Sequence, residues 1–139
     1  MFKSFFRSEC EEPVPPAKVD TTRYVLVEDT DFVRQDWARA AAESQVNLTM
    51  YSSPYDLIRE LDRFDRETVF FLDYELGKNV NGVGLAWIVK LKLGAKVYLV
   101  TSHERARFGA ELRDKVVDGV YGKFFIAGKD LSTYQEPRW

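Results

Sequence analysis

Short apolar runs alternate with amphipathic stretches over most of this chain. The spacing predicts strands over 23–28, 46–51, 68–73, 95–101 and 119–123, and helices over 31–44, 54–63, 82–92 and 104–116. The run VFFLD at 69–73 has no polar alternation, as expected of a central parallel strand covered on both faces. Because strands that alternate with helices pair in parallel, the pattern predicts an α/β fold with a five-stranded parallel sheet.

Regular patterning is confined to the middle of the chain. Residues 1–22 hold a short aromatic opening followed by acids and prolines, a composition typical of an extended tether. Residues 126–139 carry few large apolar side chains and are expected to form a short tail. We therefore expect one folded unit over 23–125, flanked by these two segments.

Polar side chains stand where several of the predicted strands end. Glu28 and Asp29 close the first strand, Asp73 the third, Thr101 the fourth and Lys123 the fifth. Because the carboxyl ends of parallel strands open on one edge of a sheet, we expect these five side chains to lie close together. Clustered carboxylates repel one another unless a cation joins them, and magnesium prefers oxygen ligands. The sequence therefore predicts a magnesium site at this edge.

The same residue types support chemistry at phosphorus. A carboxylate beside magnesium can act as a nucleophile, which would be Asp73, and a lysine ammonium such as Lys123 can neutralise phosphoryl oxygens. Thr101 would supply a hydroxyl to the same group. Each residue alone also has an ordinary explanation, since Asp29 and Thr101 could cap helices and Lys123 could be a solvated charge. Their coincidence at several strand ends favours a shared site.

Composition excludes several other classes of protein. The 139 residues have a formal net charge of −2 with acids and bases interleaved, which leaves no electrostatic footprint for nucleic acid. Cys10 is the only cysteine in the sequence, which excludes an intramolecular disulfide and a cysteine zinc cluster. His103 is the only histidine, which argues against a transition-metal centre. No sustained apolar segment is present, so we expect no membrane association and a cytoplasmic location.

Residues 23–125 resemble a response-regulator receiver domain, the phospho-accepting module of two-component signalling. The resemblance is carried by VLVEDTDFVR at the first strand, LDYEL with NG at 81–82, VTSH after the fourth strand, and DGVYGK at the fifth. It implies that Glu28, Asp29 and Asp73 hold Mg²⁺ together with the backbone carbonyl of Glu75.

The resemblance also implies a fold and an activity. Receiver domains are flavodoxin-like, doubly wound sheets of strand order 2-1-3-4-5, in which strands one and three flank the crevice. Asp73 would be the phospho-acceptor, with Thr101 and Lys123 contacting the phosphoryl group. The chain would then be a stand-alone phosphorelay protein rather than an enzyme, apart from slow hydrolysis of its own acyl phosphate. Its partners would be a histidine kinase or phosphotransfer protein and a downstream target protein.

The chain departs from the family's pattern in three places. Phe124 follows Lys123 where the family usually has proline. Val120 stands where many relatives carry an aromatic residue, whereas Tyr121 lies one residue later and should face the other side of the sheet. A full fifth helix is not evident after residue 125, so that helix is expected to be short, missing or replaced.

Three arrangements could compensate for the fifth helix. A second copy or another partner could cover the exposed face. The amino-terminal segment could dock there, since Phe2, Phe5 and Phe6 have the spacing of a helical stripe. A short irregular helix is the third arrangement.

Two other functions fit parts of the pattern. A pseudo-receiver would keep the acidic pocket but bind proteins without phosphorylation-driven switching, as Val120 and Phe124 suggest. A haloacid-dehalogenase-type phosphatase also uses an aspartate nucleophile, a hydroxyl and a lysine. There the nucleophile lies on the first motif strand, whereas in this chain Asp73 follows the acidic pair, so the order argues against a phosphatase.

Overall fold

The computed structural model describes residues 21–77 and 80–123. The strands, in chain order, are β2 (Arg23–Val27), β3 (Asn47–Tyr51), β4 (Val69–Asp73), β5 (Lys96–Thr101) and β6 (Gly119–Gly122). The helices are α1 (Asp31–Ser44), α2 (Pro54–Arg59), α3 (Gly82–Leu93) and α4 (Gly109–Arg113), with single 3₁₀ turns η1 (Leu61–Arg63) and η2 (Arg105–Phe108). The expectations for the tether, for the short tail and for the fifth helix fall on residues outside this description, as does Phe124.

The five strands within residues 21–77 and 80–123 pair in parallel in the order β3-β2-β4-β5-β6. Counted along the five strands, this is the order 2-1-3-4-5, so the predicted doubly wound topology is confirmed. The chain adds β3 on one side of β2 and then crosses to add β4 on the other side, so the direction of winding reverses between β2 and β4. These two strands are neighbours in the sheet. Their carboxyl ends therefore flank the crevice at which ligands bind in such folds.

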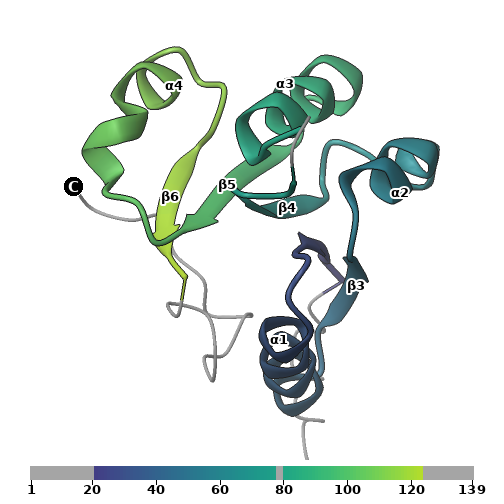
Figure 1. Cartoon of the computed structure of the whole chain (residues 1–139). Coiled ribbons are helices and arrows are strands. Elements are labelled where there is room, and N and C mark those ends of the chain that lie inside the picture. The colour runs from purple at the N-terminus through teal and green to yellow at the C-terminus, as the bar shows by residue number, and fades with distance from the viewer. Residues whose placement is uncertain (1–20, 78–79, 124–139) are drawn as a thin grey trace, which may run out of the picture.

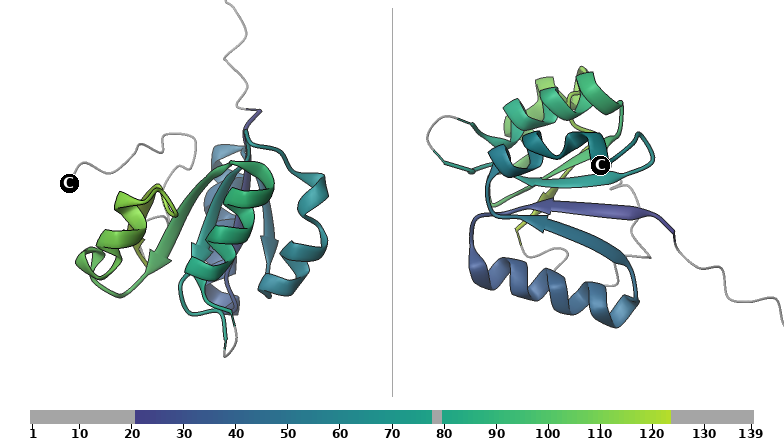
Figure 2. Two further views of the ribbon diagram at one scale, coloured as in Figure 1. Left: turned by 90° about the horizontal axis from the view of Figure 1, so that it is seen from above. Right: turned by 90° about the vertical axis from the view of Figure 1, so that its right-hand side faces the viewer.

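Helices cover both faces of the sheet, with α1 on one side and α2, α3 and α4 on the other (Figures 1 and 2). The α1 face buries Trp37 against Phe71 of β4, with ring centroids 5.1 Å apart. The opposite face buries Leu57 of α2 and Leu85 of α3 in a second cluster. Because both faces of the central strand are covered, the apolar run at 69–73 is buried as predicted.

Local sequence explains where the helices begin and end. The Ser53 side chain accepts a hydrogen bond from Tyr55 N at the start of α2, and Asn81 Oδ1 accepts one from Gly84 N at the start of α3. The α3 helix ends at Gly94, whose φ of 64° lies in the left-handed region that glycine adopts without strain. Such caps satisfy backbone groups that lack partners within the helix.

Two predicted helices are shorter than the pattern indicated. The stretch 54–63 ends as an α-helix at Arg59 and continues as the 3₁₀ turn η1. The stretch 104–116 divides into η2 and the five-residue α4. Gly109 weakens the helix at this division, and Lys115 ends it with a φ of 60°. Val116 and Val117 extended the apolar pattern of the predicted helix, but they lie in the connection between α4 and β6.

None of the helices in the described part of the chain is both long enough and apolar enough to cross a membrane.

Candidate functional site

Three carboxylates meet at the carboxyl edge of the sheet. Glu28 and Asp29 follow β2, and Asp73 ends β4, which pairs with β2 so that Val27 lies beside Leu72. One oxygen from each of the three carboxylates lies within 4.8 Å of the other two. The predicted acidic cluster therefore forms, and it joins side chains that are 45 residues apart in sequence (73 − 28).

Lys123 lies between two of these carboxylates. Its Nζ is 2.8 Å from Asp73 Oδ1 and 3.1 Å from Glu28 Oε1. Glu28 is fully buried and Asp73 nearly so, whereas the Lys123 side chain is 21% exposed. Charges removed from water need a close counter-charge, and the last strand of the sheet supplies it.

Burial and mutual repulsion change the protonation of this cluster. Burial of the Glu28 carboxyl, followed by the nearby charge of Asp73, raises its pKa to about 7, and Lys123 partly offsets this rise. Burial acts to lower the pKa of Lys123, but its contacts with Asp73 and Glu28 outweigh burial, so that pKa is raised. The ammonium is therefore held in its charged form between the two acids.

Backbone contacts fix the orientation of both buried acids. Glu75 N donates a 3.1 Å hydrogen bond to Asp73 Oδ1, the same oxygen that contacts Lys123. Among the described residues, Asp73 Oδ2 is left for a further ligand. Thr30 N donates to Glu28 Oε2 at 3.1 Å, and Arg34 Nη1 donates to the Glu28 carbonyl oxygen at 2.6 Å.

The donor set fits a hard divalent cation. Within the described chain, buried Glu28 Oε1 has no partner in good hydrogen-bond geometry, although the Lys123 ammonium lies 3.1 Å away as an ion pair. A buried oxygen without a hydrogen bond destabilises the folded state, and a bound cation would offset this cost. Oxygen ligands in a partly open site are those that Mg²⁺ prefers, since it retains several waters. Glu28, Asp29 and Asp73 could supply such a site.

Thr101 lies at the same edge, on the neighbouring strand. Asp73 pairs with Val100, so Thr101 is one residue beyond it along β5. The threonine is 2% exposed, and its Oγ1 accepts a 3.1 Å hydrogen bond from His103 N. The structure thus brings a hydroxyl, an ammonium and three carboxylates to one edge, as the sequence predicted.

The loops after β4 and β5 are joined by side-chain contacts that the sequence did not predict, although His103 was expected to lie in a loop beside the site. His103 Nε2 lies 3.0 Å from Glu75 Oε2, and Arg107 Nη1 lies 2.9 Å from His103 Nδ1. The Arg107 guanidinium also stands over the Tyr74 ring, 5.3 Å from its centroid. Tyr74 directly follows Asp73, but nothing in the sequence pattern shows that Arg107 reaches it. These contacts join the loop after β4 to the loop after β5.

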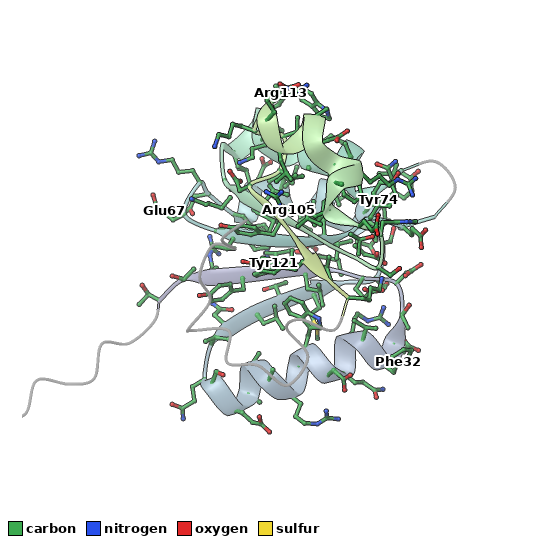
Figure 3. All side chains as sticks on the ribbon, turned by 90° about the vertical axis from the view of Figure 1, so that its left-hand side faces the viewer. Phe32, Glu67, Tyr74, Arg105, Arg113 and Tyr121 are labelled. Atoms are coloured by element: carbon green, nitrogen blue, oxygen red, sulfur yellow. The ribbon has the colours of Figure 1, made fainter. Side chains whose placement is uncertain are left out.

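Val120 and Tyr121 face opposite sides of the sheet. Val120 packs in the cluster on the α2, α3 and α4 side. Tyr121, labelled on β6 in Figure 3, belongs to the cluster on the α1 side. Its ring centroid lies 5.8 Å from that of Tyr98. The expectation drawn from the one-residue shift is therefore confirmed. Val120 therefore places a buried aliphatic side chain on the face of the sheet that α2, α3 and α4 cover.

A separate hollow of about 250 Å³ lies at the opposite edge of the sheet. Its lining is polar and comprises Thr21, Thr22, Arg23, Asp65, Glu67 and Thr68. Arg23 stacks on the Phe64 ring there, and Asp65 accepts a hydrogen bond from Glu67 N. Arg23 and Asp65 are thus engaged in local contacts, and the acidic cluster is the better candidate for chemistry.

No family model and no curated protein matches this chain. Its fold, however, is similar to those of solved receiver domains. A response regulator receiver domain protein from Clostridium thermocellum is 15% identical, with a TM-score of 0.66 over 80% of this chain and 88% of that one. A CheY-like receiver domain protein from Methanospirillum hungatei is 14% identical, with a TM-score of 0.62 over 73% and 81%.

A third similar structure was solved with a ligand. The response regulator TrrA from Thermotoga maritima, in complex with Mg²⁺ and BeF, is 18% identical, with a TM-score of 0.62 over 76% of this chain and 89% of that one. Together these likenesses show that the chain has the receiver-domain fold.

Proposed function

We propose that this chain, with its receiver-domain fold, is a response regulator that accepts a phosphoryl group on Asp73 and signals by changing which protein it binds. One observation carries the proposal: a nearly buried carboxylate lies 2.8 Å from a lysine ammonium and within 4.8 Å of two further acids. A nucleophile, a counter-charge and a cation site at one sheet edge are what transfer to an aspartate requires.

The transfer is an exchange of one bond to phosphorus for another. An oxygen of Asp73 forms an oxygen–phosphorus bond while the nitrogen–phosphorus bond of a phosphohistidine breaks, and the imidazole leaves. The donor is therefore a histidine kinase or phosphotransfer protein. Lys123 holds one phosphoryl oxygen as a point charge, and the Thr101 hydroxyl donates to another. Water later attacks phosphorus, releasing phosphate and restoring the carboxylate.

Mg²⁺ would be held by the carboxylates of Glu28, Asp29 and Asp73 and by the Glu75 carbonyl. When bound, it neutralises charge that develops on the transferring phosphoryl oxygens. Glu28 is oriented for this role by Thr30 N, which holds its other oxygen.

The test is phosphorylation with magnesium and acetyl phosphate, followed by intact-mass measurement. We expect an adduct on the wild-type chain and none on Asp73→Asn. The matched control is Asp36→Asn, which changes a helix-surface acid that pairs with Arg39 away from the site. The control should be phosphorylated like the wild type. An adduct on Asp73→Asn, or equal loss in both variants, would refute Asp73 as the acceptor.

A pseudo-receiver is the second candidate, and the buried Val120 favours it. An aliphatic side chain at this position cannot make the aromatic rearrangement that accompanies the threonine in many relatives. In this case the pocket would bind a partner protein without phosphate-driven switching. The two candidates separate if Mg²⁺ binding is first shown by chemical-shift changes at Glu28 and Asp73. Magnesium binding without any adduct would favour the pseudo-receiver.

A further inference from the structure

Helix α3 is apolar on more sides than its packing uses. Its buried side presents Gly82, Leu85, Ala86 and Val89 to the sheet. On its outer side, Trp87 is 51% exposed and Leu91 is 80% exposed. Helices that are hydrophobic all round are normally buried, so an outer apolar side indicates a missing contact.

The two exposed residues form one continuous patch, which we call the α3 patch. Trp87 and Leu91 are one helical turn apart, about 6 Å along the axis. Gly84 continues the same line, and a Cβ added there would meet nothing nearer than 3.8 Å. Four large apolar residues are exposed in the described chain, and two of them make up this patch. The neighbouring α4 has five residues, too few to cover it.

A segment of suitable chemistry lies earlier in the chain. Phe2, Phe5 and Phe6 share the i, i+3, i+4 spacing, which would place three phenyl groups on one side of a single turn. Their span of four residues equals that between Trp87 and Leu91. The function proposed above makes no use of these phenyl groups.

The segment is long enough to reach the α3 patch. The chain enters the sheet at β2, at the edge where β5 also begins, because Tyr24 pairs with Val69 and Val69 with Lys96. Helix α3 ends just before β5, so Leu91 lies on the order of 20 Å from Thr21. The 15 residues from Phe6 to Thr21 (21 − 6) extend to about 50 Å.

We propose that the amino-terminal segment docks on the α3 patch through Phe2, Phe5 and Phe6. The tether keeps the phenyl groups at a millimolar effective concentration, so even weak contacts favour the same chain over a second copy at micromolar concentration. Docking buries apolar surface on both sides, which is the driving force.

The single cysteine of the chain provides the test. A nitroxide attached to Cys10 in the full-length protein reports which backbone amide signals lie near the segment. We expect the amide signals of α3 around Trp87 and Leu91 to broaden. The combined change Phe2→Ser, Phe5→Ser and Phe6→Ser should restore them, as should Leu91→Ser. The control Phe32→Ser removes another exposed apolar residue, 59% accessible and on α1, and should leave the broadening unchanged.

Three results would overturn the proposal. The first is an absence of broadening in α3, and the second is broadening that survives the triple serine change. The third appears in a mixture of isotope-labelled protein without nitroxide and unlabelled protein with it: broadening there means that a second copy supplies the segment. Because Leu91 is 80% exposed, its serine variant should keep the wild-type fold, which the remaining amide signals verify.

Discussion

Lys123 joins two buried carboxylates, and its removal should leave both without a counter-charge. Lys123→Met is expected to lower the free energy of unfolding by about 3 kcal/mol, as for other broken buried pairs. Lys90→Met is the matched control, because Lys90 makes a similarly shielded pair with Asp118, 2.5 Å apart and away from the acidic cluster. Urea unfolding with and without Mg²⁺ measures both variants.

Magnesium should distinguish these two lysines. A divalent ion bound by Glu28 and Asp73 replaces part of the missing positive charge, so Mg²⁺ should reduce the loss in Lys123→Met and leave that in Lys90→Met unchanged. Equal rescue of both variants, or rescue of neither, would contradict a cation site at the acidic cluster.

Tyr51 and Glu60 form a second pair whose strength depends on pH. Tyr51 Oη donates a 2.6 Å hydrogen bond to Glu60 Oε1. Burial, followed by this bond, raises the pKa of Tyr51 to about 12, and the same bond, followed by Arg63, lowers the pKa of Glu60. An acid whose pKa falls on folding stabilises the fold above its unfolded pKa, here 4.5, and loses that contribution as pH decreases through its folded pKa.

Tyr51→Phe should therefore destabilise the protein at neutral pH and have a smaller effect in acid. The urea midpoints of wild type and variant are expected to differ most near pH 7 and to converge well below 4.5. A difference that stays constant across this range would mean that lost packing, rather than the bond to Glu60, causes the effect.

At the scale of residues, the sequence could predict which side chains share the site, because the carboxyl ends of parallel strands meet at one edge of the sheet. Glu28, Asp29, Asp73 and Lys123 could be placed together from chain position and sheet geometry alone. The contacts of Arg107 with His103 and Tyr74 could not, since they depend on how η2 folds back over the loop after β4. Long, flexible side chains on loops leave no periodic signal.

At the level of elements, the starts of α1, α2 and α3 were predictable, whereas the start of α4 and the lengths of α2 and α4 were not. The starts coincide with residues whose preferences are local, such as Pro54 and Asn81. The lengths of α2 and α4 depend on tertiary packing, because a five-residue helix has little stability of its own. Val116 and Val117 extended the apolar pattern of the predicted helix 104–116 although they lie in the connection to β6.

Two glycines of α3 should respond oppositely to the same substitution. A Cβ on Gly82 would lie 2.5 Å from the Asp73 carbonyl oxygen and 2.9 Å from Tyr74 Cα, so the backbone must move. Gly82→Ala is expected to lower stability by about 3 kcal/mol. Gly84 has open space, and Gly84→Ala should raise stability by about 0.5 kcal/mol because alanine favours helix. Thermal unfolding of both variants checks this, and loss of stability in both would contradict it.

At the scale of the whole molecule, alternation of strands and helices indicated a parallel sheet but did not determine which strands are neighbours. The order 2-1-3-4-5 came from the family resemblance, and the structure confirms it. Within residues 21–77 and 80–123, α1 covers one face of the sheet, and α2, α3 and α4 cover the other (Figure 2). Periodicity gives each helix an apolar side but does not assign it to a face.

A bound cation should stabilise the whole fold. A ligand that binds the folded chain and not the unfolded one adds about 1.4 kcal/mol at ten times its dissociation constant. Differential scanning calorimetry should therefore show a higher Tm with MgCl₂ than with NaCl at matched ionic strength. The shift should disappear in Asp73→Asn and persist in Asp36→Asn. An equal shift in both variants would place the cation elsewhere.

Glu28 follows β2 and Asp73 ends β4, whereas Lys123, the counter-charge of both, follows β6. During synthesis on the ribosome, Glu28 and Asp73 leave the exit tunnel well before Lys123. A nascent chain that has built only β2, β3 and β4 would have to hold two facing anions without their ammonium. The charge-compensated pocket can therefore form only after β6 and Lys123 have emerged, 50 residues after Asp73 (123 − 73).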